Sequence, residues 1–253
     1  MPEYLPEDTM YRFSGYAVLL AAGLFAAGCS RTDNRTAAQG EANRDATTAK
    51  SPGTAYVRYV SDVNAHSNTD LYFGDMRLFS TNGAEKPTGY KEVPAERRDF
   101  TLRAAGQANG MEIEKNSEGL SDGKHYTVVA FEDKDGKPVL RVFKDDESAP
   151  DAGKAKVRII DAAPASESIA LYAAGHKDKL AGESHFSDAS SWQNVDPVKA
   201  PLVIREGNAK NGYHASVPLK GLEAGRLYTI IVEGGPKSGE RLHVIDMIDS
   251  PNS

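Results

Sequence analysis

The feature that most constrains the fold is an internal repeat, because the chain aligns with itself at an offset of about one hundred residues. The matching segments are Ala55–Val60 with Ala155–Ile160, Leu71-Tyr72 with Leu171-Tyr172, Leu120–Val129 with Leu222–Ile231, and Val142 with Val244. The last two matches are offset by two residues more than the first two. Two copies of this length indicate two closed domains in tandem, since a solenoid needs several shorter units.

Short runs of strand-forming residues recur in both copies. The first contains VRYV, DLYF, FTLRA, YTVVAFE and VLRVF, and the second contains VRII, IALYA, LVIRE, YTIIVE and LHVID. Several of these runs alternate apolar and polar residues, and turn signals such as Asp122-Gly123 and Asp135-Gly136 separate them. The pattern predicts an all-β fold with two tandem immunoglobulin-like, Greek-key β-sandwich domains.

The repeat and the leading segment together predict the domain organisation. We expect a lipoprotein signal peptide at 1–28, a lipidated cysteine and disordered tether at 29–54, sandwich repeats at 55–147 and 155–249, a linker at 148–154 and a tail at 250–253. The single cysteine excludes an internal disulfide, so apolar cores must hold each domain together.

The motifs of the repeat are similar to those of a known family. The first copy has a V-R-x-V strand at Val57–Val60, then D-x-Y at Asp70–Tyr72, then L-x-x-G-x-x-Y-T-V from Leu120, and Asp145–Arg158 joins the copies. Together they resemble the bacterial envelope family called domain of unknown function 4397, over about residues 55–249. The resemblance implies surface display and a binding or structural task, with no catalytic residues to carry over.

The chain departs from that family where its first strand commonly continues with H-A-S-P-D-A-P. Ser61 and Asp161 stand at the position of the family histidine, and Pro164 is the part of this stretch that survives best. We therefore expect no role in this chain that depends on the family histidine.

The segment before the repeat resembles a bacterial lipoprotein signal. Tyr16–Gly28 is apolar and uncharged, too short to span a bilayer, and Ala26-Ala27-Gly28-Cys29 resembles a lipobox. The resemblance implies cleavage between Gly28 and Cys29 and attachment of acyl chains, such as palmitate, to Cys29. Because MPEYLPEDT is acidic, we expect translation to begin at Met10.

The anchor predicts where the protein resides. We expect a lipid-anchored cell-envelope protein facing the periplasm or the exterior, with the outer membrane favoured where two membranes exist, because Ser30 follows the cysteine in place of Asp. The formal net charge of −6 gives no attraction for nucleic acid. The expected partners are the membrane, through the lipid, and an envelope protein or polysaccharide.

Candidate catalytic and metal motifs are better explained as turns. Ser121-x-x-Lys124 contains Gly123 and runs directly into a strand, which favours a hairpin turn over a nucleophile. Glu132–Gly136 has closely spaced carboxylates but lacks the length of a calcium loop, so a hairpin is favoured. The histidines lack the spacing of zinc ligands: His66, His125, His176, His185, His214 and His243. We expect no catalytic site, no metal and no cofactor other than the covalent lipid.

Aromatic residues give the candidate ligand site. Trp192, with Tyr172 and Tyr213 expected nearby, presents a flat face suited to a sugar ring. The favoured alternative places Trp192 in the second core. Tyr126 and Tyr228 recur at the same place in both copies, which suggests a tyrosine corner.

These features predict a non-catalytic cell-envelope lipoprotein that acts as a tandem β-sandwich binding or structural module. Two alternatives stay open: an envelope hydrolase with a site between the domains, and a homotypic adhesion or assembly module that pairs through VRYV or VRII as exposed edge strands.

Overall fold

The computed structural model describes residues 51–63, 68–82, 86–105, 110–146, 148–164, 166–206, 214–234 and 243–249. These residues belong to one compact unit, 49–253. The signal-peptide and lipidation predictions, including Gly28 and Cys29, lie outside the described residues, as do Tyr213 and His66. The described part of the chain contains no helix with the length and apolarity needed to cross a bilayer.

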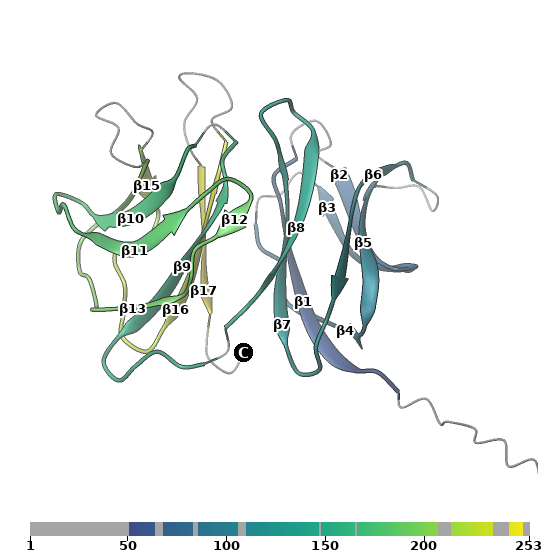
Figure 1. Cartoon of the computed structure of the whole chain (residues 1–253), viewed down its shortest axis with the longest axis horizontal. Helices are drawn as coiled ribbons and strands as arrows, with labels where there is room; N and C mark the ends of the chain where they lie inside the picture. Colours follow the sequence, from purple (N-terminus) through teal and green to yellow (C-terminus); the bar gives the residue numbers. More distant parts are fainter. Residues whose placement is uncertain are drawn as a thin grey trace, which may run out of the picture. The chain divides into compact units, whose positions relative to one another are not determined.

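The described secondary structure is strand throughout, in two sandwiches (Figure 1). The first contains β1 (Gly53–Ser61), β2 (Asn68–Phe73), β3 (Met76–Asn82), β4 (Lys91–Ala95), β5 (Arg97–Ala104), β6 (Glu112–Gly119), β7 (His125–Glu132) and β8 (Pro138–Lys144). The second contains β9 (Ala155–Ala162), β10 (Ile169–Ala173), β11 (Lys179–Ser184), β12 (Asp188–Ala189), β13 (Gln193–Val195), β14 (Leu202–Glu206), β15 (His214–Val217), β16 (Leu227–Glu233) and β17 (His243–Asp249).

Each sandwich has two sheets around its own apolar core. The first pairs β4-β1-β7-β8 with β3-β2-β5-β6, and the second pairs β12-β9-β16-β17 with β11-β10-β14-β15. Alternate side chains of β1 and β7, such as Val57 and Val128, enter the first core, and Val157 and Ile230 enter the second in the same way. The prediction of an all-β chain built from sandwiches is confirmed.

The repeat is visible in the strand register. β1 runs parallel to β7 with Val57 opposite Tyr126, and β9 runs parallel to β16 with Val157 opposite Tyr228. Both parallel pairs lie inside their sheets, flanked by other strands. The expectation that VRYV and VRII are exposed edge strands is therefore wrong, because alternation shows that a strand is buried but not which strands flank it.

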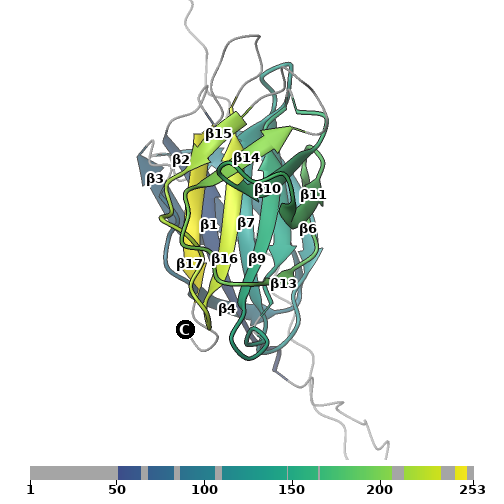
Figure 2. The same ribbon diagram turned by 90° about the vertical axis from the view of Figure 1, so that its left-hand side faces the viewer.

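The outward faces of β1 and β7 pack against those of β9 and β16. Val60, Val129 and Phe131 from the first sandwich form one buried cluster with Ile160 and Ile231 from the second. Figure 2 views these strands face on, with β16 and β9 in front of β1 and β7. Both faces of these four strands are thus buried, which explains their nearly continuous apolar sequences.

Of the two hairpin turns predicted from the sequence, the structure contains one. Asp133–Gly136 closes the antiparallel hairpin of β7 and β8, and Gly136 has a left-handed φ of 75°, so this prediction is confirmed. Ser121–Lys124 also forms a turn, closed by the Lys124 amide donating to the Ser121 carbonyl at 3.2 Å. It is not a hairpin, however, because β6 and β7 belong to different sheets.

The tyrosine corners are confirmed in both copies. The Tyr126 hydroxyl accepts a hydrogen bond from the backbone amide of Ser121, and the Tyr228 hydroxyl accepts one from that of Glu223, both at 2.9 Å. Each bond fastens the turn before the central strand to the side chain of that strand.

Candidate functional site at the junction of the sandwiches

Arg58 and Arg158 are buried at equivalent positions of β1 and β9, and each lies on the side of its strand that faces the other sandwich. Arg58 on β1 donates its Nε–H to the Thr127 hydroxyl on β7 at 2.8 Å, and Arg158 on β9 donates to the Thr229 hydroxyl on β16 at 3.1 Å. The exposed fractions of the two arginines are 5% and 2%. Since an isolated buried charge is expensive, each guanidinium needs an anionic partner.

Asp145, the first residue after β8, supplies that anion. The Arg158 Nη2 donates to it, the Arg58 Nη2 lies 3.7 Å away, and the Thr127 and Tyr90 hydroxyls donate to it at 2.8 Å. One buried carboxylate therefore binds groups from both sandwiches, which fixes the beginning of the linker between them.

Two aromatic residues occupy matching places beside the arginines. Val93 pairs opposite β1 and Val195 pairs opposite β9 in the same register. Tyr90 and Trp192 each precede that valine by three residues. They are therefore equivalent positions of the two copies.

Each of these rings carries an arginine. The Arg58 guanidinium carbon lies 4.8 Å from the Tyr90 ring centroid, and that of Arg158 lies 4.7 Å from the Trp192 centroid. Both distances suit cation–π attraction. The Tyr90 hydroxyl reaches Asp145, whereas the buried Nε1 of Trp192 has no hydrogen-bond partner among the described residues.

A pocket of about 580 Å³ lies beside the arginine centre, which consists of Arg58, Arg158 and Asp145. Its lining residues are Lys124, Lys144, Asp145, Asp146, Ser148 and Trp192. The volume is in the range of small-molecule sites. Asp146 is engaged by the Lys156 ammonium at 2.5 Å, which together with the Ser148 side chain lowers the pKa of that carboxyl against the opposing effect of partial burial. The walls thus combine an indole with two lysines.

Three aromatic side chains of the first sandwich contact one another. His125 stacks on Tyr56 with ring centroids 4.5 Å apart, and it meets Tyr90 edge-on at 4.7 Å. These residues come from β1, β7 and the segment before β4.

The structure does not bring the two predicted ligand residues together. Trp192 lines the junction pocket, while Tyr172 lies on β10 in the other sheet, where the Arg205 guanidinium stacks at 4.7 Å. The first copy repeats this pair as Tyr72 with Arg103 at 4.8 Å. The favoured placement of Trp192 in the second core is wrong, because its indole is outside that cluster.

Sequence reasoning missed the arginine centre and Tyr90. A signal for both was present, because Tyr90-x-x-Val93 and Trp192-x-x-Val195 share the later repeat offset, and Arg58 and Arg158 interrupt apolar strands at matching positions. A charged residue that recurs at the same position of two otherwise apolar strands indicates an interface.

A second group of titratable residues lies at the far end of β9. Asp161 is fully buried and accepts hydrogen bonds from the Ala163 amide at 3.0 Å and the Ser166 hydroxyl at 2.6 Å. Burial raises the pKa of Asp161 to about 6, although those hydrogen bonds and the nearby His185 oppose the rise. Within the described ranges, no group of three His, Cys, Asp or Glu side chains is arranged to hold a metal ion.

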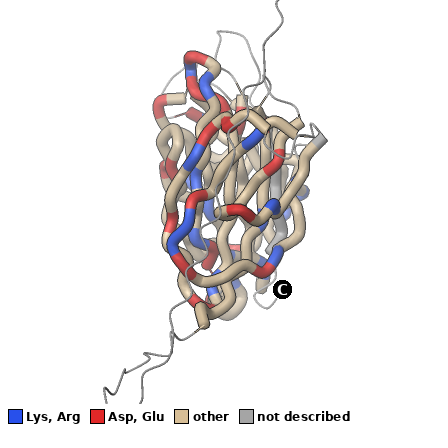
Figure 3. The backbone as a smooth tube through the Cα atoms, turned by 90° about the vertical axis from the view of Figure 1, so that its right-hand side faces the viewer, with Lys and Arg blue, Asp and Glu red and all other residues tan. Residues whose placement is uncertain are grey.

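The outer sheet of the first sandwich carries mixed charges. Figure 3 shows Lys and Arg interspersed with Asp and Glu on this side of the molecule. One exposed pair joins the two signs, with the Lys115 Nζ 3.5 Å from the Asp99 Oδ2. This face offers no single-signed surface for a polyanion.

A comparison with protein families assigns part of the chain. Residues 55–172 match the model of the domain of unknown function DUF4397. The chain contains one DUF4397 domain. The matched range begins in β1 and ends in β10, so it covers the first sandwich, the linker with Asp145, and the first two strands of the second sandwich.

Solved structures give two weak similarities. The C-terminal domain of AlgF from P. aeruginosa is 20% identical, with a TM-score of 0.29, and the match covers 38% of this chain and 99% of that domain. A candidate cell adhesion protein from Bacteroides ovatus ATCC 8483 is 10% identical, with a TM-score of 0.25, and the match covers 79% and 97%. No curated protein matches this chain.

Proposed function

We propose that this DUF4397 protein is a non-catalytic envelope lipoprotein, anchored through Cys29, whose two immunoglobulin-like sandwiches act as one binding module. Its partner is an envelope protein or polysaccharide, and its anchor is in the outer membrane where two membranes exist.

The observation that carries the proposal is the binding of Asp145 by Arg158, Thr127 and Tyr90. Together with the apolar cluster around Phe131, it links the two sandwiches through charge and packing. A module built this way presents groups of both copies in a fixed arrangement, which lowers the entropic cost of binding a ligand.

The environment of the nucleophile candidate supports a non-catalytic role. Ser121 and Lys124 lie in a turn between two sheets, and the Ser121 amide is used to fasten Tyr126. Covalent catalysis needs a serine held against a base on a defined surface.

Membrane fractionation tests the anchor. Cells producing the natural chain and a Cys29→Ser variant are labelled with palmitate and separated into membrane and soluble fractions. We expect label and membrane association for the natural chain only, because several acyl chains are needed for stable anchoring. Membrane retention of the Cys29→Ser variant contradicts the proposal.

A capture experiment tests the binding role. The Cys29→Ser protein is immobilised and exposed to envelope extracts, and it is also assayed against ester, peptide and glycan substrates. We expect a retained envelope component and no turnover. Turnover that disappears on changing one Ser, His or carboxylate contradicts the non-catalytic assignment.

A further inference from the structure

The junction pocket has the composition of a saccharide site with a cationic wall. We propose that it binds an acidic saccharide, a pyranose bearing a carboxylate, with the sugar ring against Trp192 and the carboxylate at Lys144. This inference rests on the proposed binding function and names the ligand class of that module.

Trp192 supplies the apolar surface. Its indole lines the pocket while the Arg158 guanidinium covers one face of the ring. A flat aromatic surface complements the C–H face of a pyranose. The stacked arginine and the strand β13, which begins at Gln193, hold the ring in place, so little side-chain entropy is lost on binding.

The indole also offers a polar group that the described residues leave unused. The Trp192 Nε1 is buried and has no hydrogen-bond acceptor among them. The equivalent ring of the first copy, Tyr90, satisfies its hydroxyl on Asp145. An unpaired buried donor costs free energy, and because the Trp192 Nε1 is shielded from solvent, a ligand oxygen reaches it only when the indole ring turns toward the pocket.

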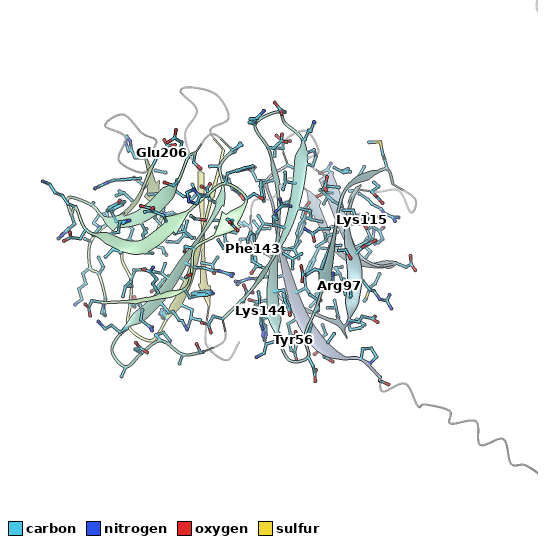
Figure 4. All side chains as sticks on the ribbon, viewed as in Figure 1. Tyr56, Arg97, Lys115, Phe143, Lys144 and Glu206 are labelled. Carbon is cyan, nitrogen blue, oxygen red and sulfur yellow. The ribbon has the colours of Figure 1, made fainter. Side chains whose placement is uncertain are left out.

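Lys144 decides the charge of the ligand. Lys144 is exposed and forms no ion pair with any described residue, and Lys124 also lines the pocket. Figure 4 shows Lys144 at the end of β8. The two carboxylates of the wall are engaged by other groups, Asp145 by arginine and Asp146 by Lys156. An anionic group is therefore preferred over a neutral one.

The volume of the pocket agrees with a short oligosaccharide. The volume of about 580 Å³ accommodates one or two sugar rings, and pockets of this order hold small ligands.

The test uses the only tryptophan of the chain as its probe. The Cys29→Ser protein is titrated with a tetrasaccharide of a hexuronic acid and, separately, with a neutral hexose tetrasaccharide, while tryptophan fluorescence is recorded at low and high salt. We expect a saturable change with the uronate, weaker binding at high salt, and at least about tenfold weaker binding of the neutral sugar.

Two lysine variants provide the matched comparison. Lys144→Gln should weaken uronate binding about tenfold. Lys137→Gln, which changes another exposed lysine on the β7–β8 hairpin, should leave binding unchanged. The proposal is overturned by a titration without saturation, by equal affinity for the neutral sugar, or by unchanged affinity of Lys144→Gln. None of these outcomes affects membrane fractionation, so failure of the ligand assignment is distinguishable from failure of the anchored-module proposal.

Discussion

Asp161 is a fully buried carboxyl group near the end of β9. Its pKa is raised by burial from 3.8 to about 6, so the folded state binds a proton more tightly than the unfolded chain. Stability from this group is therefore complete below about pH 4 and declines as pH rises through the folded pKa near 6. The difference of about two pKa units corresponds to about 3 kcal/mol.

An Asp161→Asn variant tests this coupling. Because the amide stays neutral, the free energy of unfolding should exceed that of the natural protein near pH 8, and its slope between about pH 4 and pH 6 should become shallower. Urea unfolding across this pH range measures both effects. Asp133→Asn is the control. Backbone amides lower the pKa of the Asp133 carboxyl, so this substitution should leave the slope between about pH 4 and pH 6 unchanged. An unchanged slope in Asp161→Asn would show that Asp161 does not titrate in this range.

Gly221 lies at a close backbone contact in the segment that precedes β16. It has a φ of 148°, and a Cβ added there would lie 1.9 Å from the Val198 carbonyl oxygen. Val198 and Leu222 also form a backbone bridge at this point, with hydrogen bonds of 2.9 and 2.8 Å. The backbone can approach this closely only because glycine has no side chain.

Gly221→Ala should therefore destabilise the protein by about 2 kcal/mol or more, because the bridge must open or the backbone must shift. Gly89→Ala is the matched control, since no heavy atom lies within 4 Å of its added Cβ, and it should change stability by less than about 0.5 kcal/mol. Thermal unfolding of the two variants gives the comparison. Equal melting temperatures would contradict the close approach at Gly221.

Local sequence predicts the strands and turns of this protein but not which strands lie beside one another. Alternation and turn residues were sufficient for the strands, for the Asp135-Gly136 hairpin and for the corner at Tyr126, because these depend on neighbouring residues. The position of β1 within its sheet could not be predicted, since strand neighbours are set by contacts distant in sequence. Trp192 was misplaced for a related reason, because burial against a second sandwich resembles burial in a core.

For the whole molecule, the question is whether the two sandwiches unfold together. Each has its own core, so each has the apolar packing of an independent unit. The buried pair of Arg158 and Asp145 couples them, and removing one member of a buried pair costs about 3–5 kcal/mol because the other charge is left unpaired.

Asp145→Ala should therefore divide one thermal transition into two. In the natural protein the junction makes unfolding of one sandwich expose charges of the other, so scanning calorimetry should show a single transition. Without the carboxylate, Arg58 and Arg158 are both left without their shared partner, so the junction should open first and each core should melt separately.

Asp99→Asn, which removes an exposed pair with Lys115, should change stability by less than about 1 kcal/mol and preserve the single transition. One transition at an unchanged temperature in Asp145→Ala would mean that the apolar cluster around Phe131 is sufficient to couple the sandwiches.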